Sequence, residues 1–183
     1  MRIKMPHIPY ITSKIMLDIA NSSFVEIKDQ LEKLKPCIEK VLENDLLNEK
    51  KLDEKARELL QEQEDEMDLM QVDRKNMFWL VKKKLASQFS VILDSEDRHN
   101  RLAHEILNEL VENDYINFLV SENRVKNLIF SSIEEYLRIY EKLEDEVYEK
   151  ISNYKTKPVP GSEEYELIFE KLYQEELRKK GMF

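Results

Sequence analysis

"IMLDIANSSFVEI" (Ile15–Ile27) and "ILNELVENDYINF" (Ile106–Phe118) share one pattern of apolar and polar residues with few identities, and they lie 91 residues apart. Each has apolar residues at helical spacing, then a short polar interruption, then a new start at an aromatic residue. Since the same pattern returns at a fixed interval, it indicates that one small helical unit occurs twice in the chain.

The repeat continues well beyond these two stretches. Residues 11–60 align without gaps on residues 102–151, and 16 of the 21 hydrophobic residues in the first segment face hydrophobic residues in the second. About half of the second segment is hydrophobic, so chance would give roughly ten such matches. The match returns where Met77 and Phe78 fall on Ile168 and Phe169. Apolar positions repeat while surface residues differ, as expected after duplication and divergence.

Composition and periodicity together predict an all-α fold of two related antiparallel helical units in tandem, residues 1–90 and 91–183, in an elongated protein. Only two glycines occur among 183 residues, and 42% of the residues are hydrophobic. Apolar spacing predicts helices near 12–20, from 24, from 36 to 60 with a break near Asn48, and over 71–87, 97–112, 115–121, 123–153 and 162–180. The alternating "MRIKM" (1–5) and the β-branched "FSVIL" (89–93) are the candidates for a short two-stranded β element.

The charge distribution argues against a protein that coats nucleic acids over its whole surface. The net charge is −9, with 16 basic and 17 acidic residues in 1–92 and 13 and 21 in 93–183, so the halves carry −1 and −8. Phosphate binding needs a positive surface. A local basic patch is therefore expected only in the first half.

Cellular location is predicted from cysteine content and hydropathy. Cys37 is the only cysteine, which excludes an internal disulfide and fits a reducing compartment. The N-terminus lacks the apolar core of a signal peptide, and no segment has about 18 uncharged apolar residues. These features predict a cytoplasmic protein with no membrane contact. The high Lys and Glu content is also typical of proteins from hot-living organisms.

Three segments resemble one known family. They are "IPYITSKIMLDIANSSFVEI" near the N-terminus, "DRKNMFWLVKKKLA" in the middle and "EEYELIFEKLYQEELRKKGMF" at the C-terminus. In combination they resemble the bacterial domain of unknown function 507 family, over essentially the whole chain. That family has no assigned activity, so the resemblance implies no catalytic or ligand-binding residue.

Signatures of catalysis and metal binding are lacking in the sequence. GxGxxG, GxxxxGK[ST], GxSxG and HExxH do not occur. Cys37 follows Pro36 at a predicted helix start, where the helix dipole could lower its pKa; the alternative is a small core residue aligned with Leu128. His99 and His104 are five residues apart, a spacing that does not place two side chains on one helix face. We therefore predict no enzyme, no metal and no cofactor.

The stretch "RKNMFWLVKKK" (74–84) is the candidate binding patch. It has five positive charges, and no acidic residue occurs from Arg74 to Leu93. A helical wheel places Met77, Phe78, Val81 and Leu85 on one face and Trp79 nearly opposite. The patch residues are Lys75, Trp79, Lys82, Lys83 and Lys84. An outward Trp79 could stack on a base or hold an acidic partner; alternatively, Trp79 buries against the other unit.

We expect from these features a non-enzymatic helical interaction or scaffold protein that binds an as yet unidentified protein partner, as a monomer or a homodimer. The long amphipathic helices also suit a helical hairpin or self-association. The alternative is a nucleic-acid-associated protein that uses the basic helix over 74–84.

Overall fold

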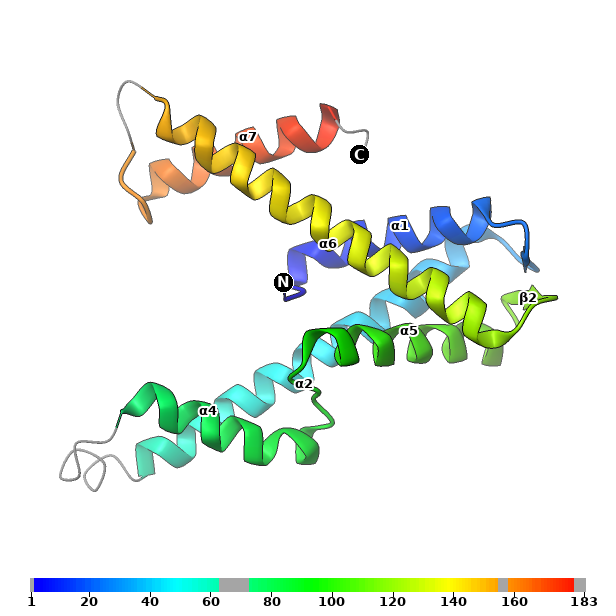
Figure 1. Cartoon of the computed structure of the whole chain (residues 1–183), viewed down its shortest axis with the longest axis horizontal. Coiled ribbons are helices and arrows are strands. Elements are labelled where there is room, and N and C mark those ends of the chain that lie inside the picture. The colour runs from blue at the N-terminus through cyan, green and yellow to red at the C-terminus, as the bar shows by residue number, and fades with distance from the viewer. Residues whose placement is uncertain (1, 63–72, 155–157, 180–183) are drawn as a thin grey trace. The chain divides into compact units, whose positions relative to one another are not determined.

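The computed structural model describes residues 2–62, 73–154 and 158–179. These residues form six α-helices: α1 (Ile8–Asn21), α2 (Leu34–Glu62), α4 (Arg74–Leu85), α5 (Ser95–Glu112), α6 (Glu122–Ser152) and α7 (Glu163–Lys179). Short 3-10 helices precede α1 and α2 and follow α4, at Met5–His7, Leu31–Lys33 and Ala86–Phe89. The predicted all-α fold is confirmed (Figure 1).

A two-stranded antiparallel sheet is also present, but not where the sequence suggested. Its strands are β1 (Val25–Ile27) and β2 (Ile116–Phe118). The candidates 1–5 and 89–93 were wrong, because the described residues 2–4 and 91–93 pair with no strand and residues 5–7 and 86–89 form 3-10 helices. Helices predicted from residue 24 and over 115–121 were also wrong, because these segments contain the strands β1 and β2. Alternation of only three residues is too short for periodicity to separate a strand from a helix start.

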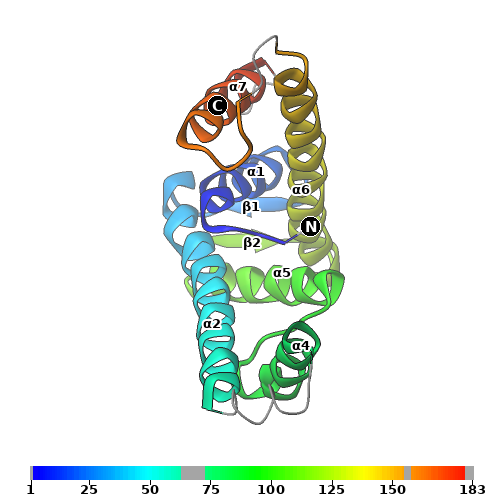
Figure 2. The ribbon, with the colours of Figure 1, turned by 90° about the vertical axis from the view of Figure 1, so that its left-hand side faces the viewer.

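The strand register shows what the two repeated stretches, Ile15–Ile27 and Ile106–Phe118, do in the fold. Val25 pairs with Phe118 and Ile27 pairs with Ile116, while Glu26 lies opposite Asn117. Adding the interval of 91 gives Ile116 as the counterpart of Val25 and Phe118 as the counterpart of Ile27. The pair Val25–Phe118 is therefore equivalent to the pair Ile116–Ile27 when the two copies are exchanged. The two-stranded sheet therefore joins the two copies through equivalent residues. This is the arrangement of an isologous contact about a local two-fold axis. Figure 2 shows the two strands side by side.

The order of elements repeats as well. Among the described residues, the order helix, strand, long helix and shorter helix occurs as α1, β1, α2 and α4, and again as α5, β2, α6 and α7. Adding 91 to Asn21, the last residue of α1, gives Glu112, the last residue of α5. The structure thus supports two related helical units.

Helix boundaries follow from local chemistry. Helix α1 starts at Ile8, with Pro9 in its first turn, which is four residues before the predicted start near residue 12. Pro36 lies in the first turn of α2, which continues to Glu62 without the predicted break at Asn48. Asp73 caps α4 by accepting hydrogen bonds from the backbone N–H groups of Lys75 and Asn76.

Backbone contacts divide the chain into two compact units, Arg2–Ile133 and the region from Glu134 onward. The first contains α1, α2, α4, α5, both strands and the start of α6, with Ile11, Ile15, Leu102 and Ile106 fully buried. In the second, α7 and the end of α6 include the buried residues Leu143, Val147, Tyr173 and Leu177. This division reflects which residues pack together and falls between Ile133 and Glu134. The boundary between 1–90 and 91–183, which was inferred from the repeat, stays a prediction.

Candidate interaction surface on helix α4

Helix α4 has an inward and an outward face. Met77, Phe78, Val81 and Leu85 are half-buried, as the helical wheel predicted. On the other face Trp79 is 42% exposed and Leu80 is 63% exposed. The alternative that Trp79 is buried is therefore wrong. Figure 1 shows α4 beside the end of α2, to which its inward face is attached.

Lysines of the candidate patch separate into two groups. Lys75, Lys83 and Lys84 are exposed. Lys82 is not part of this surface, because its side chain is only 1% exposed and forms ion pairs with Glu49 at 2.9 Å and Asp53 at 2.6 Å. The prediction that Lys82 flanks Trp79 on the outer face was wrong in its exposure, although its Nζ lies 5.5 Å from the centre of the indole ring.

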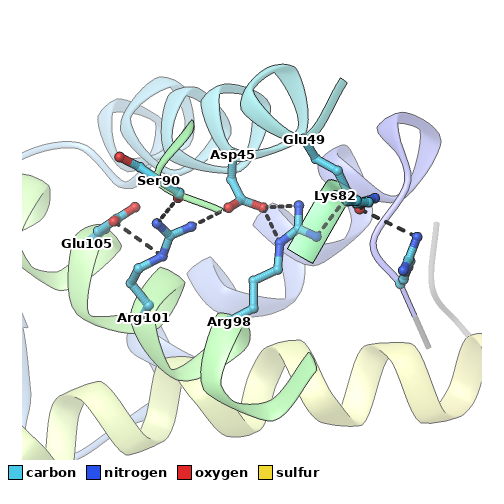
Figure 3. Close-up of polar contacts among 8 residues, drawn as sticks. Asp45, Glu49, Lys82, Ser90, Arg98, Arg101 and Glu105 are labelled. Atoms are coloured by element: carbon cyan, nitrogen blue, oxygen red, sulfur yellow. Dashed lines mark hydrogen bonds and ion pairs between the residues drawn. The ribbon is translucent and has the colours of Figure 1, made fainter. Parts of the chain in front are cut away.

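A buried ionic network holds the inward face of α4 in place. Asp45, Glu49 and Asp53 follow one another at four-residue intervals along α2, so they share one face of that helix. Opposite them lie Lys82 of α4 and Arg98 of α5 (Figure 3). These acids occupy or border the buried stripe of α2, where apolar residues would ordinarily pack.

Arg98 is the centre of this network. Its Nε donates to Asp45 Oδ2 at 2.7 Å, and its Nη1 donates to Glu49 at 2.6 Å. Arg101 donates to Asp45 Oδ1 at 2.5 Å and to the backbone carbonyl of Ser90. Because both oxygens of Asp45 accept from guanidinium groups, its buried charge is compensated. Ser90 itself has a left-handed backbone, with φ 55°.

The network also shifts pKa values. Burial raises the pKa of the Glu49 carboxyl, but hydrogen bonds from Lys82 and Arg98 outweigh burial, so the pKa lies below its usual value. For Arg98, burial lowers the pKa and the hydrogen bonds and charges of Asp45 and Glu49 raise it above its usual value. Both groups therefore remain charged at neutral pH.

Two cations lie near the indole ring of Trp79. The guanidinium carbon of Arg2 lies 5.2 Å from the ring centre, and Arg2 also lies 3.5 Å from Glu49. Phe78 contacts the indole edge-on, with ring centres 6.3 Å apart. Cations over an aromatic face are attracted by its negative potential. These contacts restrict the orientation of the exposed indole.

The sequence did not reveal the ionic network, although a signal was present. Burial along α2 falls on Ile38, Leu42, Leu52 and Ala56, and Asp45 lies on this same stripe. An acid in the middle of an apolar stripe predicts a buried ion pair, but the partner residues come from other helices. In the second copy, the positions of Asp45, Glu49 and Lys82 hold Tyr136, Tyr140 and Tyr173, whose rings contact one another.

Other candidates from the sequence do not form sites in the described residues. His99 is buried and His104 is exposed, so they lie on different faces of α5. Cys37 is half-buried; burial and the charge of Glu109 raise the pKa of its thiol, contrary to activation by the helix dipole. Within residues 2–62, 73–154 and 158–179 no group of His, Cys, Asp and Glu side chains is arranged to hold a metal ion. The acidic run Glu62–Asp68 lies almost entirely outside the described residues.

Comparison with known proteins gives a family but no activity. The family model described as "Protein of unknown function (DUF507)" matches residues 1–182. The chain belongs to this family, as the three segments suggested. No curated protein matches the chain. Among the described helices, none has a stretch long and apolar enough to cross a membrane.

Proposed function

We propose that this protein is a non-enzymatic interaction or scaffold protein of the bacterial cytoplasm, and that the outward face of α4 binds an acidic surface of another protein. The observation that carries this proposal is the exposed pair Trp79 and Leu80, at 42% and 63%, between exposed lysines. Large exposed apolar residues surrounded by charges are typical of interface centres, where aromatic anchors supply most of the binding energy.

Support also comes from the rigidity of this surface. Asp73 fixes the first turn of α4, and Lys82 anchors its inward face to α2 through two ion pairs. Arg2 and Lys82, which both pair with Glu49, lie 5.2 and 5.5 Å from the ring centre of Trp79. Because a preorganised side chain loses little entropy on binding, such a surface favours specific association.

A photo-crosslinking experiment tests the proposal. A benzophenone amino acid at position 80 of the full-length protein is expected to crosslink a partner protein in native lysate. The matched control is position 17, because Leu17 of α1 is 57% exposed and Leu80 is 63% exposed. In the variant with benzophenone at position 80, Trp79→Asp should abolish the capture of that partner, whereas Leu17→Asp should not. Equal crosslinking at both positions, or capture that survives Trp79→Asp, would exclude α4 as the binding surface.

Nucleic-acid association is the second candidate function. It is favoured by an exposed Trp79 with Lys75, Lys83 and Lys84 on a segment that has no acid from Arg74 to Leu93. Three lysines that contact phosphates predict that the affinity for single strands falls with a log–log salt slope of about −2. Fluorescence anisotropy with labelled single-stranded RNA and DNA, at low and moderate salt, tests this. Lack of binding at low salt, or binding unaffected by Trp79→Ala, excludes it.

A further inference from the structure

We propose that the acidic surface recognised by α4 is helix α7 of a second copy of this chain. This inference rests on the proposed function and identifies its partner. Each molecule would present both a basic face on α4 and an acidic face on α7, so copies associate head to tail. The argument uses each helix by itself, with its own exposed residues.

Helix α7 has an exposed acidic face with an apolar residue at its centre. Leu167 is 67% exposed. Glu163, Glu164, Glu166 and Glu170 are exposed around it, together with one cation, Lys171. Ser162 orders the start of this helix by accepting a hydrogen bond from the backbone N–H of Tyr165 at 3.2 Å. This face therefore has an exposed apolar centre, as the outer face of α4 does, and a net charge of the opposite sign.

Spacing along the two helices is similar. Trp79 lies four residues after Lys75 and four before Lys83, while Leu167 lies four residues after Glu163 and three before Glu170. At 1.5 Å per residue, α4 is about 18 Å long and α7 about 26 Å, so α7 can cover the whole outer face of α4. Charged residues on either side of an apolar centre can then pair across the contact while the apolar side chains meet.

The internal repeat places two of these opposite charges at equivalent positions. Adding 91 converts Lys75 and Lys84 of α4 into the exposed Glu166 and Glu175 of α7, and Trp79 into the exposed Glu170. Leu80 and Lys83 fall on Lys171 and Gln174. Two of the three exposed lysines of α4 thus correspond to acids in the repeat, which supports the complementarity of one copy to the other.

A protein helix explains the α4 surface better than a phosphate backbone does. Leu80 is the most exposed apolar side chain of α4 and offers an aliphatic surface, which does not stack on bases. Lys82 is withdrawn into ion pairs with Glu49 and Asp53, which leaves fewer cations for phosphates. Contact between different faces is heterologous, so it generates a ring or an open chain of molecules.

Charge reversal tests the pairing in the full-length protein. Sedimentation velocity of the wild type at low salt should show a mass that grows with concentration and returns to the monomer at high salt. Lys83→Glu with Lys84→Glu reverses the charge at the C-terminal end of the α4 face, and Glu166→Lys with Glu170→Lys reverses the charge beside Leu167 on the α7 face. Each double variant alone should associate at least about tenfold more weakly than the wild type.

Mixing the two double variants provides the decisive observation. In the mixture every contact can again join opposite charges, so association should return to near the wild-type level. Glu43→Lys with Glu112→Lys is the control, because both residues are exposed on other helices and the change in charge equals that of the second variant. Circular dichroism establishes that each variant is folded.

Three results would overturn the inference: a wild type that is monomeric at low salt, double variants that associate like the wild type, or a mixture that stays monomeric. The proposed function fails separately. If copies do not associate but a different protein still crosslinks at position 80 and is lost on Trp79→Asp, α4 is an interaction surface for that protein and only the self-association is refuted.

Discussion

Arg98 and Asp45 form a buried ion pair across 53 residues of sequence, with Arg98 Nε 2.7 Å from Asp45 Oδ2. Their side chains are 9% and 2% exposed. This pair connects α5 to α2 at the point where the apolar stripe of α2 is interrupted. It also supports the neighbouring Glu49, which in turn binds Lys82 of α4. The placement of the candidate surface therefore depends on charges that lie beneath it.

Removing one partner of this pair should strongly destabilise the fold. Asp45→Ala leaves Arg98 and Arg101 without their shared acceptor, and we expect the free energy of unfolding to fall by about 3 to 5 kcal/mol. Urea denaturation followed by circular dichroism measures the change. Glu43→Ala is the control, since Glu43 is exposed on the same helix and should change stability by less than about 0.5 kcal/mol.

A double-mutant cycle isolates the interaction itself. Asp45→Ala combined with Arg98→Ala should cost less than the two single changes together, by about 1 kcal/mol or more. Strictly additive costs would show that the two side chains stabilise the protein independently.

Two neighbouring lysines should behave differently. Lys82→Ala removes the partner of Glu49 and Asp53, and we expect a loss of about 2 kcal/mol, between the values for exposed and fully buried pairs. Lys83→Ala removes an exposed charge and should cost less than about 0.5 kcal/mol. Thermal and urea unfolding compare the two variants. Equal losses would mean that the ion pairs of Lys82 add nothing to stability.

Equivalent strand residues should contribute unequally. Ile116 of β2 is 3% exposed, whereas its counterpart Val25 of β1 is half-buried. Ile116→Ala should therefore cost about 2 to 4 kcal/mol, and Val25→Ala about 1 kcal/mol. Urea unfolding of both variants gives the comparison, and a larger loss for Val25→Ala would contradict the observed burial.

His7 predicts a pH dependence of stability. Burial, together with the charge of Lys4, lowers the pKa of His7 from 6.5 to about 4. Between these values the unfolded chain binds a proton that the folded chain does not, so stability falls as pH decreases from 6.5 towards 4. The loss should reach at most about 3 kcal/mol.

Urea unfolding at several pH values measures this effect, with His7→Phe as the test variant. Since phenylalanine does not titrate, the variant should lose less stability than the wild type over the same interval. An unchanged slope would assign the pH dependence to other groups. Glu49, whose pKa is lowered, acts at lower pH: its contribution is present above its usual value of 4.5 and disappears as pH falls through its folded value.

The amino-acid sequence by itself determined the helical class, the duplicated unit and the inward face of α4. These follow from apolar spacing, which reports which side of a helix avoids water, and that requirement is local. It also showed the segment without acids from Arg74 to Leu93. Membership of the family followed from three short segments and was confirmed over residues 1–182.

The tertiary structure decided which parts of the repeated segments become strands and which lysines remain at the surface. Val25–Ile27 and Ile116–Phe118 become strands because each supplies the hydrogen-bonding partner of the other, 91 residues away, and three residues have no strand preference strong enough to show alone. Lys82 is buried because Glu49 and Asp53 lie opposite it on another helix. The sequence gives the charge of each side chain. Whether that charge faces water or an oppositely charged partner depends on residues that are brought near it only by folding.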